Sequence, residues 1–155
     1  MIDIGDPAPD FTLEDQDGTP FNLGDHGKVV IYFYPKAFTP GCTTEACDFR
    51  DNHSAFTKAG YQVVGISPDP VERLEAFRDK HDLPFPVLSD EDHAVAAAYG
   101  AWGTKKNYGR EYQGIIRSTF VVADGVIEKA WRNVRAKGHV ARVLEGIEQG
   151  ATADG

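Results

Sequence analysis

Residues 28–47 read KVVIYFYPKAFTPGCTTEAC and predict a strand, a turn and the start of a helix. The run KVVIYFYP is almost continuously apolar, which is typical of a central strand covered on both faces, and Pro35 ends it because proline cannot donate to the ladder. From about Cys42, apolar residues recur at spacings of three and four, which predicts a helix over 42–58 that closes at Gly60. We therefore expect a strand–turn–helix unit at the centre of the fold.

The segments around this unit alternate between predicted strands and helices. Upstream, FTLED and TPFNL flank an Asp-Gly pair and predict a hairpin. Downstream we expect a strand, a helix, a short strand, a helix, a long Gly- and Lys-rich loop, a hairpin and a last helix, at 61–67, 71–82, 86–90, 91–100, 101–117, 118–131 and 139–149. This order predicts an α/β sandwich of thioredoxin type, with a central mixed β-sheet flanked by helices and an N-terminal β-hairpin. Residues 1–150 are expected to form one domain, and 151–155 a disordered tail.

Composition narrows the classes of function. The 155 residues have a formal net charge of −8, which argues against nucleic acid or an anionic membrane surface as partners. No apolar run approaches the ~20 residues of a membrane span, and the start MIDIGDPAPDF lacks the features of a secretory signal, so we expect a cytoplasmic protein. Cytoplasmic reductants keep thiols reduced, which favours a catalytic or redox-active role for the chain's two cysteines over a structural disulfide.

Cys42 is predicted to lie where the strand has ended and the helix begins, behind Pro40-Gly41. Unpaired amides and the positive end of the helix dipole stabilise a thiolate at such a place, and thiol pKa values there fall from ~8.5 to about 3.5–7.5. The hydroxyl of Thr39 could hydrogen-bond an oxygen of a substrate. Taken singly, each residue also has a plainer interpretation: Pro35 as a strand breaker, Thr39 as a turn or capping residue, and Glu45 as a first-turn acid.

Together, Pro35, Thr39 and Cys42 match the pattern P-x-x-x-T-x-x-C, and the sequence resembles the peroxiredoxins, in particular the Q-type or bacterioferritin comigratory subfamily. The likeness extends to GDPAPDFTL, WGTKKNYG and GIIRSTFVV. It implies that Cys42 is the peroxidatic cysteine and that Thr39, Pro35 and Arg117 complete the site. A fixed guanidinium would stabilise the charge that develops when the O–O bond breaks. Glu45 matches a position that is often acidic in the family, and we expect it to orient Arg117 or a neighbouring residue.

Cys47 follows Cys42 by five residues, and the resemblance implies that it resolves the Cys42 sulfenic acid as a disulfide. The alternative is a buried free cysteine of the core. The resemblance further implies hydrogen peroxide and organic hydroperoxides as substrates, a thioredoxin- or glutaredoxin-like reductant, no cofactor, and a monomer or weak homodimer.

Two alternatives remain beside this interpretation, and a third is set aside. A thioredoxin-like disulfide oxidoreductase would use C-x-x-C, whereas this chain has C-x-x-x-x-C. A non-enzymatic redox sensor would oxidise the same pair without turnover. A metal site at Cys42, Cys47 and His53 lacks an obvious fourth ligand, so we expect no metal.

Overall fold

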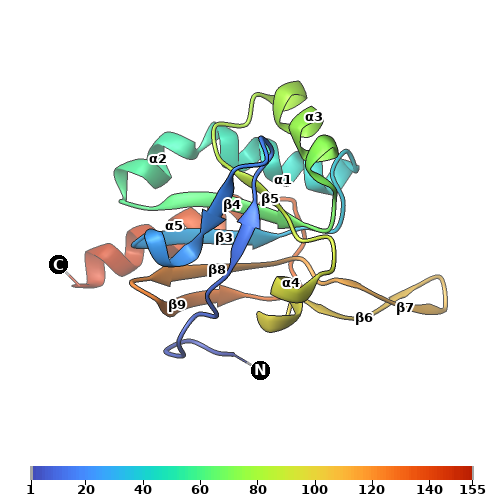
Figure 1. Cartoon of the computed structure of the whole chain (residues 1–155). Coiled ribbons are helices and arrows are strands. Elements are labelled where there is room, and N and C mark those ends of the chain that lie inside the picture. The colour runs from blue at the N-terminus through green and yellow to red at the C-terminus, as the bar shows by residue number, and fades with distance from the viewer. Residues whose placement is uncertain (1, 155) are drawn as a thin grey trace.

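The computed structural model describes residues 2–154, and its centre is a mixed sheet of seven strands in the order β2-β1-β5-β4-β3-β8-β9 (Figure 1). Its strands are β1 (Thr12–Glu14), β2 (Pro20–Asn22), β3 (Lys28–Phe33), β4 (Gln62–Ser67), β5 (Val87–Ser89), β8 (Ser118–Ala123) and β9 (Val126–Trp131). β3 pairs in parallel with β4 and antiparallel with β8, which places the predicted central strand in the interior of the sheet.

The side chains of β3 alternate between two hydrophobic cores. Val30 and Tyr32 belong to the core on one face, and Val29, Ile31 and Phe33 to the core on the other. This alternation explains the continuous apolar run, because successive side chains of a strand point to opposite faces and both faces of this sheet are covered.

Helices cover both faces of the sheet, as Figure 1 shows. The helices are η1 (Leu23–Asp25, a 3₁₀ turn), α1 (Pro40–Asp51), α2 (His53–Lys58), α3 (Val71–His81), α4 (Ala94–Ala98) and α5 (His139–Asp154). Side chains from α1, α2, α3 and α5 pack into one core, while the other core receives α4 and the N-terminal segment. The predicted mixed sheet flanked by helices is therefore confirmed.

The predicted single helix over 42–58 is wrong in two respects. α1 begins at Pro40, because proline suits the first helical position, where an amide hydrogen would have no partner. The helix then ends at Asn52, whose φ of −107° and ψ of 8° are not helical and whose side-chain amide donates to the Asp48 carbonyl over 2.8 Å. This side-chain bond competes with the regular helical pattern, so a separate helix α2 follows.

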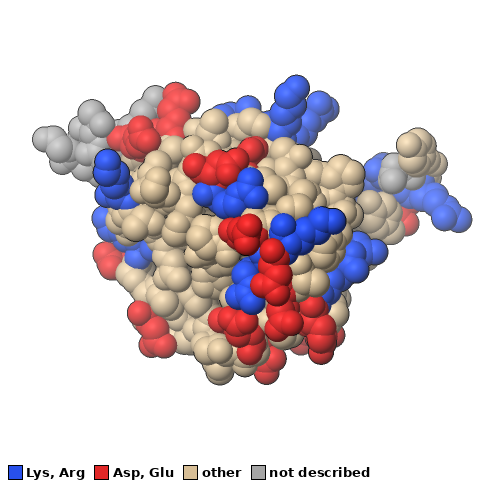
Figure 2. All heavy atoms as spheres, turned by 90° about the horizontal axis from the view of Figure 1, so that it is seen from above, with Lys and Arg blue, Asp and Glu red and all other residues tan. Residues whose placement is uncertain are grey.

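The predicted loop over 101–117 is also wrong, because most of it forms an antiparallel hairpin of β6 (Trp102–Asn107) and β7 (Arg110–Ile115). Tyr108 and Gly109 make the turn, with φ values of 52° and 78°. The hairpin projects from the body of the molecule in Figure 1, and Lys and Arg side chains gather at the corresponding edge in Figure 2. It is a polar arm rather than an irregular connection.

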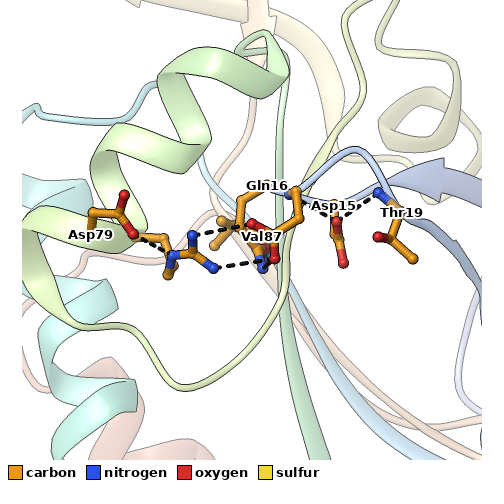
Figure 3. A network of polar contacts seen from close by, with 7 residues as sticks. Asp15, Gln16, Thr19, Asp79 and Val87 are labelled. Atoms are coloured by element: carbon orange, nitrogen blue, oxygen red, sulfur yellow. Dashed lines mark hydrogen bonds and ion pairs between the residues drawn. The ribbon is translucent and has the colours of Figure 1, made fainter.

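The predicted N-terminal hairpin is confirmed, and polar contacts join its turn to β5 and α3 (Figure 3). Asp15 accepts from the amide of Thr19 over 2.9 Å, which closes the turn. The side chain of Gln16 accepts from the amide of Val87 in β5 over 3.0 Å. Arg78 of α3 binds Asp17 over 3.1 Å and so holds the turn against the helix.

The last helix, α5, continues to Asp154, past residue 150 where the sequence predicts the domain to end; Gly155 lies outside the described residues. No helix within residues 2–154 has the length and apolar character needed to cross a membrane.

Candidate active site

Cys42 is the third residue of α1 and is only 1% exposed. The chain leaves β3, passes half-buried Pro35 and enters the helix through Thr39, whose extended backbone makes it the N-terminal cap. First-turn amides have no partners within the helix, and together with the helix dipole they favour an anion there. The structure therefore places the Cys42 thiol in the first turn of the helix, directly after the strand and the turn.

The Arg117 guanidinium contacts the Cys42 thiol directly. Arg117 lies between β7 and β8, and its Nη2 donates to the Cys42 Sγ over 3.3 Å. A side chain at Gly41 would interfere, because a Cβ atom there would lie 3.2 Å from Nη2 of Arg117. Glycine at this position therefore lets the guanidinium approach the first turn of α1.

Glu45 holds the other side of this guanidinium. Its Oε1 accepts from Nη1 of Arg117 over 2.5 Å, and its side chain is fully buried. Burial raises the pKa of Glu45 to about 7, because the carboxylate loses contact with water, although the charge of Arg117 and its hydrogen bond offset part of this rise. Glu45 and Cys42 thus contact the same guanidinium from one helix, three residues apart.

Thr39 and Pro35 lie on the approach to α1. The Thr39 hydroxyl donates to the Lys36 carbonyl over 2.7 Å and makes no side-chain cap to the helix. This bond uses the hydroxyl proton, so in this conformation the Thr39 oxygen is free only to accept a hydrogen bond. Pro35 follows Tyr34, whose amide donates to the Ile66 carbonyl of β4 over 3.1 Å.

Two residues near Cys42 were not predicted from the sequence. Tyr32 is buried beside the site, and burial followed by the charges of Tyr34, Glu45 and Cys42 raises its pKa well above the ordinary value. Period-two alternation along β3 is the signal that could have placed it on the helix-covered face. Lys105 of β6 also reaches the site: its pKa is lowered by burial and then by the charge of Arg117, while Cys42 acts in the opposite direction.

Cys47 has different surroundings, although it belongs to the same helix. It is partly exposed, and its Sγ lies 3.8 Å from Nδ1 of His81, the last residue of α3. Both cysteines are free thiols. Residues five apart on an ideal helix have Cα atoms separated by roughly 8.7 Å, beyond the limit of about 7 Å for a disulfide.

Metal binding finds no support in these residues. Across the part of the chain that the structure describes, no group of three or more His, Cys, Asp or Glu side chains could hold a metal ion. The arrangement is instead that of a nucleophilic thiol site on an α/β sandwich, with a guanidinium aimed at the sulfur.

Comparison with known proteins identifies a family whose members resemble this chain in sequence and structure. Residues 4–130 match the model of the AhpC/TSA family. Peroxiredoxin Bcp of Bacillus subtilis is 48% identical over 95% of this chain and 96% of its own length, and Peroxiredoxin Bcp of Escherichia coli is 47% identical over 97% and 98%. Among solved structures, the bacterioferritin comigratory protein of Xanthomonas campestris has a TM-score of 0.86 at 39% identity, covering 91% of this chain and 92% of that one. A PrxQ structure from Xylella fastidiosa has a TM-score of 0.91 at 32% identity, covering 97% and 98%.

The chain belongs to the AhpC/TSA family, within its peroxiredoxins of the Bcp or Q type. It is accordingly a thiol-dependent peroxidase with a thioredoxin-like fold.

Proposed function

We propose that the chain reduces hydrogen peroxide and organic hydroperoxides at Cys42, transfers the oxidation to Cys47 as a disulfide, and is reduced again by a thioredoxin- or glutaredoxin-like dithiol. The observation that supports it most strongly is the contact of 3.3 Å between Arg117 Nη2 and the buried sulfur of Cys42 at the start of α1. The related protein of Xanthomonas campestris has been studied for alkyl peroxide reduction, which supports the choice of substrate.

The first step follows from this contact. The Cys42 thiolate attacks the terminal oxygen of the hydroperoxide, the O–O bond breaks, and the sulfur keeps an OH group as sulfenic acid. The departing alkoxide or hydroxide takes a proton from solvent. Arg117 donates where negative charge develops on that leaving oxygen, and Glu45 fixes its orientation. Thr39 and Pro35 shape the approach, and Thr39 accepts a hydrogen bond from the hydroperoxide.

The second step requires α1 to change shape. Because both cysteines lie in α1 and residues five apart on a regular helix are too far apart for a disulfide, the turns between them must unwind before the two sulfurs meet. Gly41 gives a flexible entry to the helix, and Thr43 and Thr44 are only modest helix formers. The disulfide then prevents further oxidation of Cys42 to sulfinic acid.

Steady-state consumption of peroxide tests the proposal. With a thioredoxin system, the wild-type protein should turn over many times, which a non-enzymatic redox sensor cannot do. If the protein reduced insulin disulfides faster than it consumed peroxide, it would be a disulfide oxidoreductase instead. The proposal includes a reducing compartment such as the cytoplasm, because the catalytic cycle needs a dithiol reductant.

A further inference from the structure

The side chains of Cys47 and His81 lie within hydrogen-bonding distance of each other. The separation of 3.8 Å between Sγ and Nδ1 is within reach of a weak S–H···N hydrogen bond, and 34 residues separate the two in the chain. Both side chains are partly exposed. No step of the peroxide reaction at Cys42 uses this histidine.

The ring of His81 is held in place from several sides. Phe77 meets it edge-on with ring centroids 5.2 Å apart, and the ring centroid of Phe38 lies 6.5 Å away. Arg50 of α1 donates to the His81 carbonyl over 2.8 Å and binds Asp51 over 3.0 Å. Arg50 thereby fastens the last turn of α1 to the end of α3.

Different contacts hold the two parts of α1. The residues after Cys47 are held by Arg50 and by buried Phe49, whereas Cys42 and Glu45 are held by Arg117 and the helix start has no side-chain cap. We take the unwinding to begin at the turn with Cys42, so that Cys47 stays beside His81.

The charged and titratable groups that face His81 are Cys47 and Arg50 from α1 and Lys80 from α3 itself. Burial, followed by the charges of Lys80 and Arg50, lowers the pKa of His81 below its ordinary value. The imidazole is therefore mostly neutral at pH 7, and a neutral imidazole can accept a proton from a thiol.

We propose that His81 is the general base of the resolving step and takes the proton of Cys47 as this thiol attacks the Cys42 sulfenic acid. The inference rests on the proposed resolving role of Cys47. The S–H bond of Cys47 and the S–O bond of Cys42 break, and the S–S bond forms. The Cys47 sulfur is oxidised, the Cys42 sulfur is reduced, and hydroxide leaves. The proton reaches this hydroxide from His81 through solvent, which gives water and restores the neutral imidazole.

His81→Gln tests the proposal in a single turnover. The reduced protein is mixed with one equivalent of hydrogen peroxide and quenched at intervals with an alkylating reagent. Mass spectrometry of the intact protein then distinguishes the sulfenic acid form from the disulfide form. We expect the rate of the peroxide step to stay within about twofold, and disulfide formation at pH 7 to slow by about tenfold to a hundredfold. In the variant this rate should rise about tenfold per pH unit, because hydroxide must then remove the proton. His53→Gln, which changes a histidine whose ring centroid lies 6.3 Å from that of Phe85, is the control and should behave as the wild type.

Imidazole added to His81→Ala supplies a second readout, which a purely structural role of His81 would not affect. Millimolar imidazole should accelerate disulfide formation in this variant and leave the wild type unchanged. A wild-type rate and pH profile of disulfide formation in His81→Gln, or the absence of rescue in His81→Ala, would overturn the proposal. Cys47→Ser separates this failure from that of the proposed function: if Cys47→Ser still turns over with thioredoxin, Cys47 is not the resolving thiol, whereas a stall of Cys47→Ser beside a normal His81→Gln removes only the role of His81.

Discussion

α1 carries two thiols in contrasting environments. At the first turn, Cys42 is 1% exposed and receives a hydrogen bond from Arg117. Further along the helix, Cys47 is partly exposed and lies beside His81. On an ideal helix, five residues also rotate the two side chains some 140° apart.

This difference assigns different chemistry to two identical side chains. A fixed cation and free amides favour attack on a peroxide bond at the first thiol, because charge develops there in the transition state. The second thiol has a neutral base and access to solvent, which suits a later attack on sulfur and exchange with a protein dithiol. The helix that separates the thiols also keeps the two steps apart until it unwinds.

The largest expected effect comes from removing either thiol. Cys42→Ser should abolish peroxide reduction, because the nucleophile is lost. Cys47→Ser should consume about one equivalent and then stall with thioredoxin, because only the resolving step is lost. Steady-state peroxide consumption measures both variants. Thioredoxin-coupled turnover of Cys47→Ser at the wild-type rate would show that the two thiols do not divide the two steps between them.

Arg117→Lys should lower the second-order rate with peroxide by about tenfold to a hundredfold. A lysine ammonium keeps the charge, but it lacks the two separate nitrogen donors with which Arg117 binds Glu45 and the Cys42 sulfur at once. Competition kinetics against a second peroxidase measures this rate, and Arg142→Lys on an exposed part of α5 is the matched control. An unchanged rate in Arg117→Lys would remove the electrostatic distinction between the two thiols.

Glu45→Gln should have a smaller effect on the peroxide rate, less than about tenfold, because the amide oxygen can still accept from Arg117. Its clearer effect is on stability. Burial raises the pKa of Glu45 to about 7 in the folded protein, from an ordinary value of 4.5, so the native state binds more protons than the unfolded state between these values. The stability of the wild type relative to Glu45→Gln should therefore fall as pH rises through this window, by up to about 3 kcal/mol. Denaturant unfolding from pH 4 to pH 8 tests this, and parallel stability curves for the two proteins would contradict it.

The sequence is sufficient to predict β3, the other strands of the main sheet and the presence of a helix after Pro35, since each has a local signal. The apolar run of β3 reports a strand covered on both faces, and Asp-Gly pairs mark two of the hairpin turns. The β6–β7 hairpin cannot be predicted from the sequence pattern, for a physical reason. It projects into solvent, so most of its side chains are polar on both faces, and its turn at Tyr108-Gly109 lacks the usual Asn-Gly or Asp-Gly pair.

Some residues of the candidate site can likewise be predicted from local sequence signals, and others cannot. Cys42 and Thr39 follow from their place between a strand and a helix, whereas Arg117 and Glu45 depend on the family resemblance, because nothing local distinguishes them from solvated charges. The structure then brings Glu45 and Arg117 together from 72 residues apart. The contact of Cys47 with His81 has no local signal, because it arises only when α3 packs beside α1.

Hydrogen exchange of the amides over 43–49, compared between the dithiol and disulfide forms, tests the central claim most directly. The account predicts that these amides are protected in the reduced protein, where α1 is helical, and that they lose at least about tenfold of this protection in the disulfide form. The amides of α2 provide the internal control, because this helix should keep its protection in both forms. Equal protection of residues 43–49 in the two redox states would contradict the claim that α1 unwinds to join Cys42 and Cys47.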